Sequence, residues 1–208
     1  GTATDGTDSL VFRGGITNTN ALTIRADRAV RIGDQGVAGS IITGAGAITK
    51  TGLDTLVLNS SNTYTGITNV SNGVVLLKTS AGLGSGLNGT SDHTTVASGA
   101  AVVFDLNTIT VPEFFTINGT GINTTGVLRW PSTSTGNTLS GTILVNATGS
   151  RINSDAAALT LNNTTAAINT STSNALSIGG LGGITVTGLL SGGGTITKDG
   201  TGSSSILT

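Results

Sequence analysis

The sequence predicts an all-β fold, and within that class a β-solenoid, in which short parallel strands stack coil upon coil. Two observations carry this prediction. Short apolar or alternating segments follow one another at intervals of roughly seven to twelve residues, with Gly, Asn, Ser and Thr between them. The stretch GAGAITKTGLDTLVL at 44–58 also returns in degraded form as GGGTITKDGTGSSSIL at 192–207, which is typical of a repeat array.

The expected strands are short, and in many of them Thr alternates with Leu, Ile or Val. Alternation with a period of two places one set of side chains inside and the other in solvent. We expect strands at 9–12, 21–24, 40–43, 55–58, 74–77, 101–104, 115–118, 127–129, 141–145, 159–161, 176–178 and 184–186. Helix is disfavoured by the Gly and β-branched content. The exception is 25–31, which is consistent with one or two helical turns and equally with a strand whose charged residues face outward.

Three architectures accommodate strands this short and numerous: a sandwich, a barrel and a solenoid. The solenoid is favoured because the segments follow without long excursions, because small apolar residues suit a narrow tube, and because the sequence repeats over a long range. Asn recurs at the expected turns, where stacked coils can align it into hydrogen-bonded ladders. These asparagines are Asn59, Asn62, Asn69, Asn72, Asn88, Asn118, Asn123, Asn162 and Asn163.

Composition and charge exclude several classes of protein. The 208 residues carry a net charge of −1, and the nine Lys and Arg form no stripe, so nucleic acid is not an expected partner. No apolar run approaches about 18 residues, so we expect no membrane-spanning segment. The lack of Cys excludes disulfides and Cys-based metal sites. Because the chain has no Met and no signal peptide, we expect that it was processed or lies within a longer reading frame.

One segment carries a specific resemblance. Residues 42–77 contain a Gly-x-Gly-x-Ile-Thr-Lys-Thr-Gly core at 44–52, then Leu-Val-Leu, then Asn-Thr-Tyr-Thr-Gly at 62–66. This segment resembles the autotransporter-associated β-strand repeat of bacterial passenger domains. Residues 115–198 are similar to the long spacer between such units in very large surface proteins. The second copy departs from the pattern at Asp199 and at 203–205. The resemblance implies a right-handed parallel β-helix that is exported to the cell surface.

The candidates for hydrolytic chemistry are few. His93 is the only histidine, and it follows Ser91 and Asp92 without a Gly-x-Ser-x-Gly elbow, so we expect a solvated loop residue rather than a member of a triad. A β-helix enzyme needs a local cluster of carboxylates, often with Arg or Lys. We expect the scattered acids to be turn residues or solubilising charges. They are Asp5, Asp8, Asp27, Asp34, Asp54, Asp92, Asp105, Glu113, Asp155 and Asp199.

The candidates for ion binding are also weak. Asp5-Gly-Thr-Asp8 resembles part of a Ca²⁺ loop but lacks the spacing of known calcium motifs, so an ordinary turn is expected. The glycines at 44–46 and 192–194 precede no expected helix, which argues against a phosphate site and for tight corners. The densest charge cluster is expected to be a solvated face, with a partner patch as the alternative. It comprises Arg25, Asp27, Arg28, Arg31 and Asp34.

Asn-x-Ser/Thr sequences are frequent, but in a chain this rich in Asn and Thr many arise by chance, so they are weak indications of glycosylation. They include Asn69, Asn88, Asn118, Asn146 and Asn169.

These observations predict that residues 1–208 form one continuous β-solenoid segment, a window from a longer array. The expected function is structural, in a bacterial extracellular or cell-surface fibre, sheath or stalk. We expect no catalytic activity and no catalytic, cofactor-binding or metal-binding residues. The expected partner is the protein itself, end to end or through covalently continuous repeats.

Two alternatives remain at this stage. An adhesin rod that binds glycans or other cells would be favoured by a row of exposed aromatic residues, for which Tyr64 and Trp130 are the only Tyr and Trp. A carbohydrate-active β-helix enzyme would be favoured if several acids converged with Arg129 or Arg151 in one groove.

Overall fold

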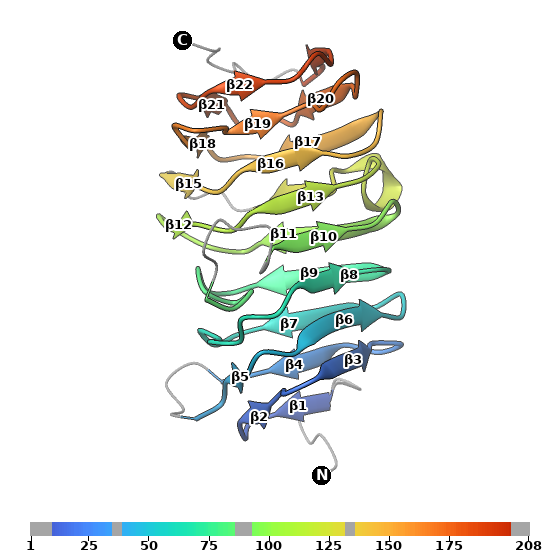
Figure 1. Ribbon diagram of the computed structural model, residues 1–208, viewed down its shortest axis with the longest axis vertical. Coiled ribbons are helices and arrows are strands. Elements are labelled where there is room, and N and C mark those ends of the chain that lie inside the picture. The colour runs from blue at the N-terminus through green and yellow to red at the C-terminus, as the bar shows by residue number, and fades with distance from the viewer. Residues whose placement is uncertain (1–9, 35–38, 86–92, 132–135, 201–208) are drawn as a thin grey trace.

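The structure, a computed structural model, describes residues 10–34, 39–85, 93–131 and 136–200. It confirms the all-β prediction: parallel strands stack along one axis as a β-solenoid (Figure 1). In that view the strands facing the reader run left to right and those behind run right to left while the chain climbs from β1 towards β23. The solenoid is therefore right-handed. Among the described residues the one helical element is the 3₁₀ turn η1 (Ile122–Thr124).

The longest sheet, which we call face A, has nine parallel strands and forms the back of the solenoid in Figure 1. Its strands, in order, are β1 (Leu10–Phe12), β4 (Val30–Ile32), β7 (Thr55–Leu58), β9 (Gly73–Leu77), β11 (Ala100–Phe104), β14 (Leu128–Trp130), β17 (Ser150–Ser154), β20 (Leu176–Gly179) and β23 (Ile196–Lys198).

The second sheet, face C, has eight parallel strands and faces the reader in Figure 1. Its strands are β3 (Ala21–Arg25), β6 (Ala47–Thr51), β8 (Thr68–Val70), β10 (Thr94–Val96), β13 (Phe115–Ile117), β16 (Ile143–Val145), β19 (Ile168–Asn169) and β22 (Leu190–Ser191).

The third side, face D, is less regular. It holds a two-stranded sheet of β2 (Ile16–Thr17) and β5 (Ile42–Thr43), and a four-stranded sheet of β12 (Thr110–Val111), β15 (Asn137–Leu139), β18 (Leu159–Leu161) and β21 (Ile184–Val186).

Between these two sheets the stack is continued by an asparagine. The Asn62 Oδ1 accepts the backbone N–H of Ile42 at 2.8 Å, and its Nδ2 donates to the carbonyl of Gly82 at 2.6 Å. The side chain is 2% exposed, so it satisfies groups of the coils on either side without water. Both of these bonds are to backbone groups and not to a further asparagine. The predicted contact between asparagines of neighbouring coils occurs at Asn118, whose Oδ1 accepts from the Asn146 Nδ2 at 2.9 Å.

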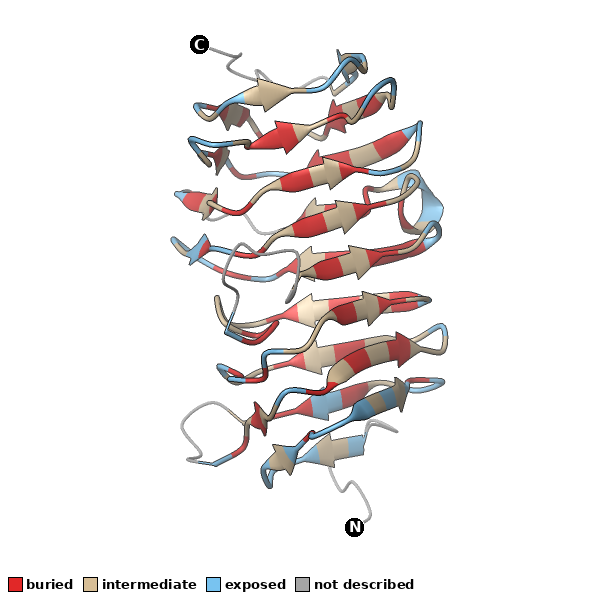
Figure 2. Cartoon of the chain, in the orientation of Figure 1, coloured by how far each residue is buried: buried red, intermediate tan, exposed pale blue. Residues whose placement is uncertain are grey.

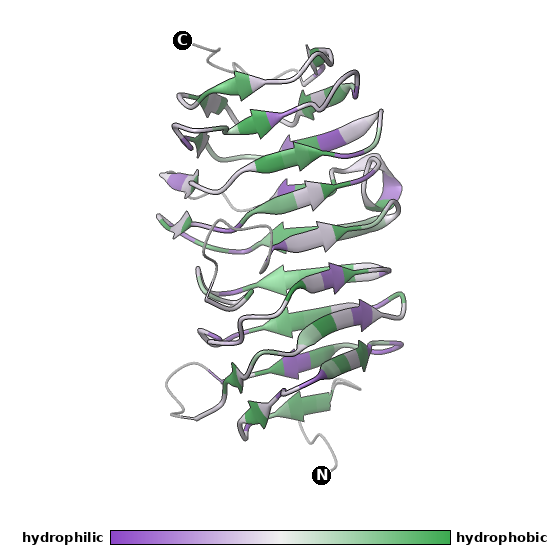
Figure 3. Ribbon diagram, in the orientation of Figure 1, coloured by the Kyte–Doolittle hydropathy of each residue, from purple (hydrophilic) through white to green (hydrophobic). Residues whose placement is uncertain are grey.

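The core follows the predicted alternation of side chains. In β9 the burial pattern is buried, intermediate, buried, intermediate, buried, and most other strands repeat it (Figure 2). Leu, Ile and Val fill most of the tube, and apolar residues recur in strand after strand along its length (Figure 3). Large rings contribute more than the sequence suggested: Phe104 and Trp130 stack at 3.9 Å between centroids, and Phe115 packs edge-on against Phe104 at 5.8 Å.

The segment 25–31 contains no helix. Arg25 ends β3, Ala26 is buried at the corner, and Val30 begins β4, so the charged residues belong to a strand–corner–strand unit. Helix is absent here because both neighbouring strands already pair in register with the next coil, Ala21 with Ala47 and Val30 with Leu56.

The two copies of the sequence repeat lie on different sheets. Lys50 belongs to β6 of face C, whereas Lys198 belongs to β23 of face A. The distance between the copies is therefore not a whole number of coils. Each copy forms a strand of alternating side chains that is followed by a corner with glycine. Because strands of both faces have this local structure, similar sequences can occur on either face.

Candidate functional site

The core of the repeat places a lysine inside the solenoid. Lys50 points inward from β6 and its residue is 0% exposed. Its ammonium donates to the carbonyls of Thr51 at 3.0 Å, Gly52 at 2.7 Å and Asn72 at 2.9 Å. The third of these carbonyls belongs to the following coil. Lys50 therefore closes the corner between β6 and β7 and ties it to the next turn of the solenoid.

Burial lowers the pKa of the Lys50 ammonium from its ordinary value, because desolvation disfavours the charged form. The carboxylates of Asp54 and Asp27 act in the opposite direction through Coulomb attraction. With three carbonyl acceptors around the nitrogen, this arrangement explains how a charged residue is accommodated at an inward position.

Replacing Lys50 by methionine should lower the free energy of unfolding by about 1–3 kcal/mol, because methionine keeps most of the side-chain length but removes a donor from three carbonyls. Among the described residues, only the carbonyl of Thr51 keeps a backbone donor, the N–H of Ala26. Lys198→Met is the matched control: Lys198 is exposed and, within the described ranges, donates to the Gly200 carbonyl alone, so its replacement should cost less than about 0.5 kcal/mol. Chemical denaturation followed by circular dichroism measures both. Equal losses would contradict the role assigned to Lys50.

The lowered pKa of Lys50 also predicts a pH dependence. Between this pKa and the ordinary value of 10.5, the unfolded chain binds more protons at this position than the folded chain does. The free energy of unfolding should therefore rise with pH across this window. Measured from about pH 8 upwards, the stability difference between the parent protein and Lys50→Met should move in favour of the parent. A difference that stays constant or moves the other way would contradict the burial of a charged lysine.

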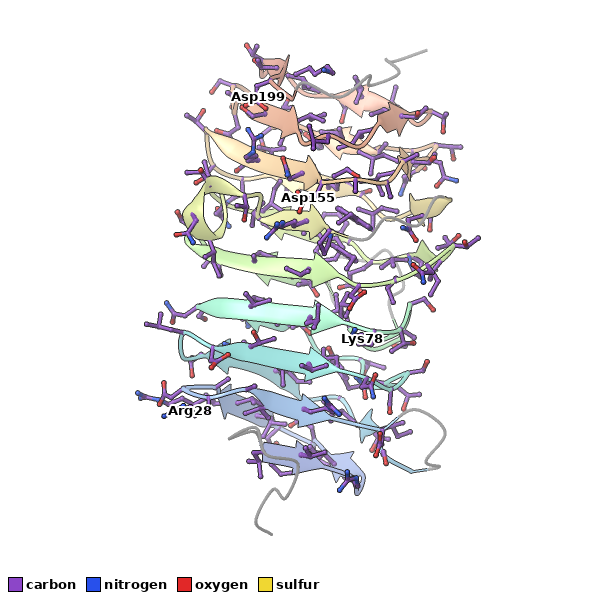
Figure 4. All side chains as sticks on the ribbon, turned by 180° about the vertical axis from the view of Figure 1, so that it is seen from behind. Arg28, Lys78, Asp155 and Asp199 are labelled. Atoms are coloured by element: carbon purple, nitrogen blue, oxygen red, sulfur yellow. The ribbon has the colours of Figure 1, made fainter. Side chains whose placement is uncertain are left out.

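A second set of polar side chains lies on the outer surface of face A, where ion pairs join different coils (Figure 4). Arg13 pairs with Asp34 at 3.0 Å, Lys78 with Asp105, Arg129 with Asp155 at 2.6 Å, and Arg151 with Asp199.

The pair of Arg151 and Asp199 spans two coil intervals. Arg151 lies on β17 and Asp199 follows β23, with β20 between them. The guanidinium passes over Gly179, where an added Cβ would lie 2.0 Å from the Arg151 Nη2. The glycine therefore leaves the space through which the arginine reaches Asp199. Asn153 extends the network, since it accepts from Arg151 and donates to Asp155.

Asp155 and Asp199 thus converge with Arg129 and Arg151. The carbohydrate-active enzyme alternative requires such a convergence, and it also requires that the residues lie in one groove. Each carboxylate is bound to a guanidinium on the outer surface of face A, and neither Asp155 nor Asp199 lines the hollow at residues 140–165 or the one at residues 16–22. We interpret the network as a set of ties between coils. Such partly exposed pairs contribute about 0–1 kcal/mol each.

The other predicted candidates are dispersed. His93 is half-buried and packs edge-on against Phe114 at 5.8 Å between ring centroids. Ser91 and Asp92 lie outside the described residues, as do Asp5, Asp8 and Asn88. Over the described ranges, no group of three or more His, Asp or Glu could hold a metal ion. The Arg25 guanidinium pairs with the Asp27 carboxylate at 2.5 Å on an exposed surface.

The glycine-rich stretches are corners, as expected: Gly44 and Gly192 both have positive φ.

A group of polar residues that the sequence did not predict lies inside the solenoid. The Tyr64 hydroxyl lies 2.7 Å from the Thr68 hydroxyl, and the Thr94 hydroxyl donates to the Glu113 carboxylate at 2.7 Å. All four residues are 2% exposed or less. Burial raises the pKa of the Tyr64 phenol. The sequences Thr-Asn-Val of β8 and Thr-Thr-Val of β10 gave no indication of this group, because Thr also occupies outward positions, as at Thr95.

Comparison with known proteins bears on the segment that holds Lys50. Residues 48–77 match the family model described as the passenger-associated-transport-repeat. The resemblance to an autotransporter passenger repeat is confirmed. In the structure this passenger repeat runs from β6 through β9, and it includes the shortest step between strands of face A, in which Leu56 pairs with Val75. Searches of curated proteins and of solved structures returned no match. Within the described ranges, no helix is long and apolar enough to cross a membrane.

Outside the passenger repeat, face D presents an uncharged polar surface. Thr110, Thr138, Thr160 and Thr185 lie side by side in register on β12, β15, β18 and β21. Next to this column is an open hollow of about 530 Å³. It is lined by Ser140, Thr142, Asn162, Asn163, Thr164 and Thr165. Tyr64 and Trp130 lie in the core at 1% and 2% exposure, so neither supplies an aromatic platform there.

Proposed function

We propose that this chain is a structural segment of an extracellular or cell-surface bacterial fibre or stalk, without catalytic activity of its own. The observation that carries the proposal is the continuity of face A, in which nine parallel strands are hydrogen-bonded from β1 to β23. Backbone hydrogen bonds in such a stack run along the long axis at about 4.8 Å per coil, so the same bonds that form the sheet resist extension.

The remaining support comes from the passenger repeat and from the surface. Repeats of the autotransporter passenger family suggest secretion to the cell surface. The charged side chains of face A form ties between coils, and Thr occupies outward positions of the other faces, which solvates the solenoid with little charge. In this proposal the partners along the axis are further coils, either covalently continuous or paired through strand edges.

A replacement experiment in the producing cell tests the structural role. In one strain the chain is deleted in frame, and in another it is replaced by an unrelated β-solenoid of equal length. If the chain serves as a length of rod, the deletion should shorten the surface projection in electron micrographs and the replacement should restore both its length and the adhesion of the cells. Restored length with lost adhesion would contradict a purely structural role and indicate a binding surface.

The second candidate function is glycan binding by the same rod, and the hollow on face D favours it. Its hydroxyl and amide groups offer donors and acceptors without charge, which suits a neutral carbohydrate. The test is binding of the chain to a panel of neutral glycans. Binding that is lost in Asn162→Ala and kept in Asn69→Ala, on the outer surface of face C, would support this candidate. Absence of binding across the panel would contradict it.

A further inference from the structure

The outward positions of face A differ from those of the other two faces. The paired outward positions of face D are Thr, and the outward column of face C is mainly polar, as in the register partners Thr49, Asn69, Thr95 and Thr116, although Leu144 comes next in this column. On face A, three consecutive strands, β7, β9 and β11, instead present one apolar column in register, Val57, Leu76 and Val103. Val74 and Ala101 pair beside it. The four larger side chains are half-buried.

The apolar column has a charged rim at one side. Lys78 follows Leu76 by two residues, and Asp105 follows Val103 by two residues. Since Leu76 and Val103 pair in register, Lys78 and Asp105 lie side by side on adjacent coils, where they form an ion pair. Their side chains are 34% and 45% exposed. The rim therefore has opposite charges on neighbouring coils.

We propose that this surface binds a second copy of the same chain, with the two solenoids side by side and antiparallel. The inference rests on self-complementarity. A two-fold axis that runs along the strand direction between β9 and β11 exchanges these two strands between the copies. It places Leu76 against the partner's Val103 and Lys78 against the partner's Asp105. Leu76 and Val103 of the two copies then bury each other, Val57 faces the partner's Arg129 at the equivalent register position of β14, and both rim charges meet an opposite charge.

The same axis accounts for the most exposed large apolar residue in the described ranges. Leu53 is 83% exposed at the corner before β7. The two-fold exchange relates β7 to β14, whose preceding corner carries η1 with Ile122. It thus brings the corner that holds Leu53 opposite the partner's corner that holds Ile122. It also relates β4 to β17, so the exposed guanidinium of Arg31 faces Asn153 and the neighbouring Asp155.

Charge reversal in separate copies tests the arrangement. In sedimentation experiments on the 208-residue chain we expect a dimer. Lys78→Glu and Asp105→Lys should each weaken the dimer by about tenfold or more, because each makes both rim contacts repulsive. An equimolar mixture of the two variants should recover the parent affinity, since one copy then supplies two acidic groups and the other two basic groups. Loss of the intramolecular pair alone cannot give this recovery, because both variants lack it.

A second measurement uses the absence of cysteine from the chain. Leu76→Cys should form a disulfide-linked dimer under mild oxidation, whereas Thr95→Cys on face C should not. The proposal is overturned if the parent chain is monomeric, if the mixture fails to recover the dimer, or if the two cysteine variants cross-link equally. It rests on the arrangement of face A and not on the proposed mechanical role, so a monomeric result leaves the rod intact.

Discussion

Trp130→Ala should lower the free energy of unfolding by about 3–5 kcal/mol, the largest effect that we expect from a single side chain. Trp130 is 2% exposed and its ring stacks on Phe104 of the preceding coil at 3.9 Å with an interplanar angle of 2°. Removing the indole leaves a cavity in the core. The strands β11 and β17 on either side are held by their backbone hydrogen bonds to β14, so they cannot move in to fill the cavity. Urea unfolding followed by far-ultraviolet circular dichroism measures the loss.

Trp130→Phe is the matched control. Phenylalanine retains a ring against Phe104 and removes only part of the volume, so the loss should be about half as large or less. If alanine and phenylalanine at this position cost the same, or if neither changes the unfolding midpoint, Trp130 does not lie in the core and the register between β14 and its neighbours is wrong.

Gly44→Ala should cost about 3 kcal/mol or more, because it combines left-handed backbone strain with a backbone clash. Gly44 has φ +102°, and an added Cβ would lie 2.0 Å from the Asn18 carbonyl oxygen of the preceding coil. That oxygen cannot move freely, since it accepts the N–H of Gly46. The substitution therefore forces two coils apart at the corner before β6.

Gly99→Ala separates the two contributions to this cost. Gly99 has φ +79° and no atom within 4 Å of an added Cβ, so only the backbone strain of about 1–2 kcal/mol should appear. Thermal unfolding of the two variants under the same conditions gives the comparison. A cost at Gly44 no greater than that at Gly99 would show that the coils are not stacked as closely at this corner as the structure has them.

The fold was predictable because it depends on local patterns. Alternation placed Ile48 and Leu56 inside, glycine placed the corners, and the repeat together with the family resemblance indicated the solenoid and its hand. The alternation and the glycine positions do not predict which residues of neighbouring coils are in contact. Lys198 and Lys50 are equivalent in sequence but lie on different faces, because both faces are built from the same strand-and-corner unit.

The polar contacts were less predictable for a physical reason. Arg151 meets Asp199 only because two further strands of face A bring them together and Gly179 leaves space between them. Thr94 faces inward and contacts Glu113, whereas Thr95 faces outward. The two residues are identical, and only their position in the inward–outward alternation of the strand separates them. Contacts of this kind depend on coil length and register, and coil length varies from one turn to the next.

The central claim is that this chain forms a continuous axial stack within a longer surface structure. Cryo-electron microscopy of the native material, sheared from the producing cells and marked by an antibody against the chain, tests it most directly. We expect a thin rod whose marked segment shows a continuous axial repeat of about 4.8 Å. A compact globular body at the marked position, without that repeat, would contradict it.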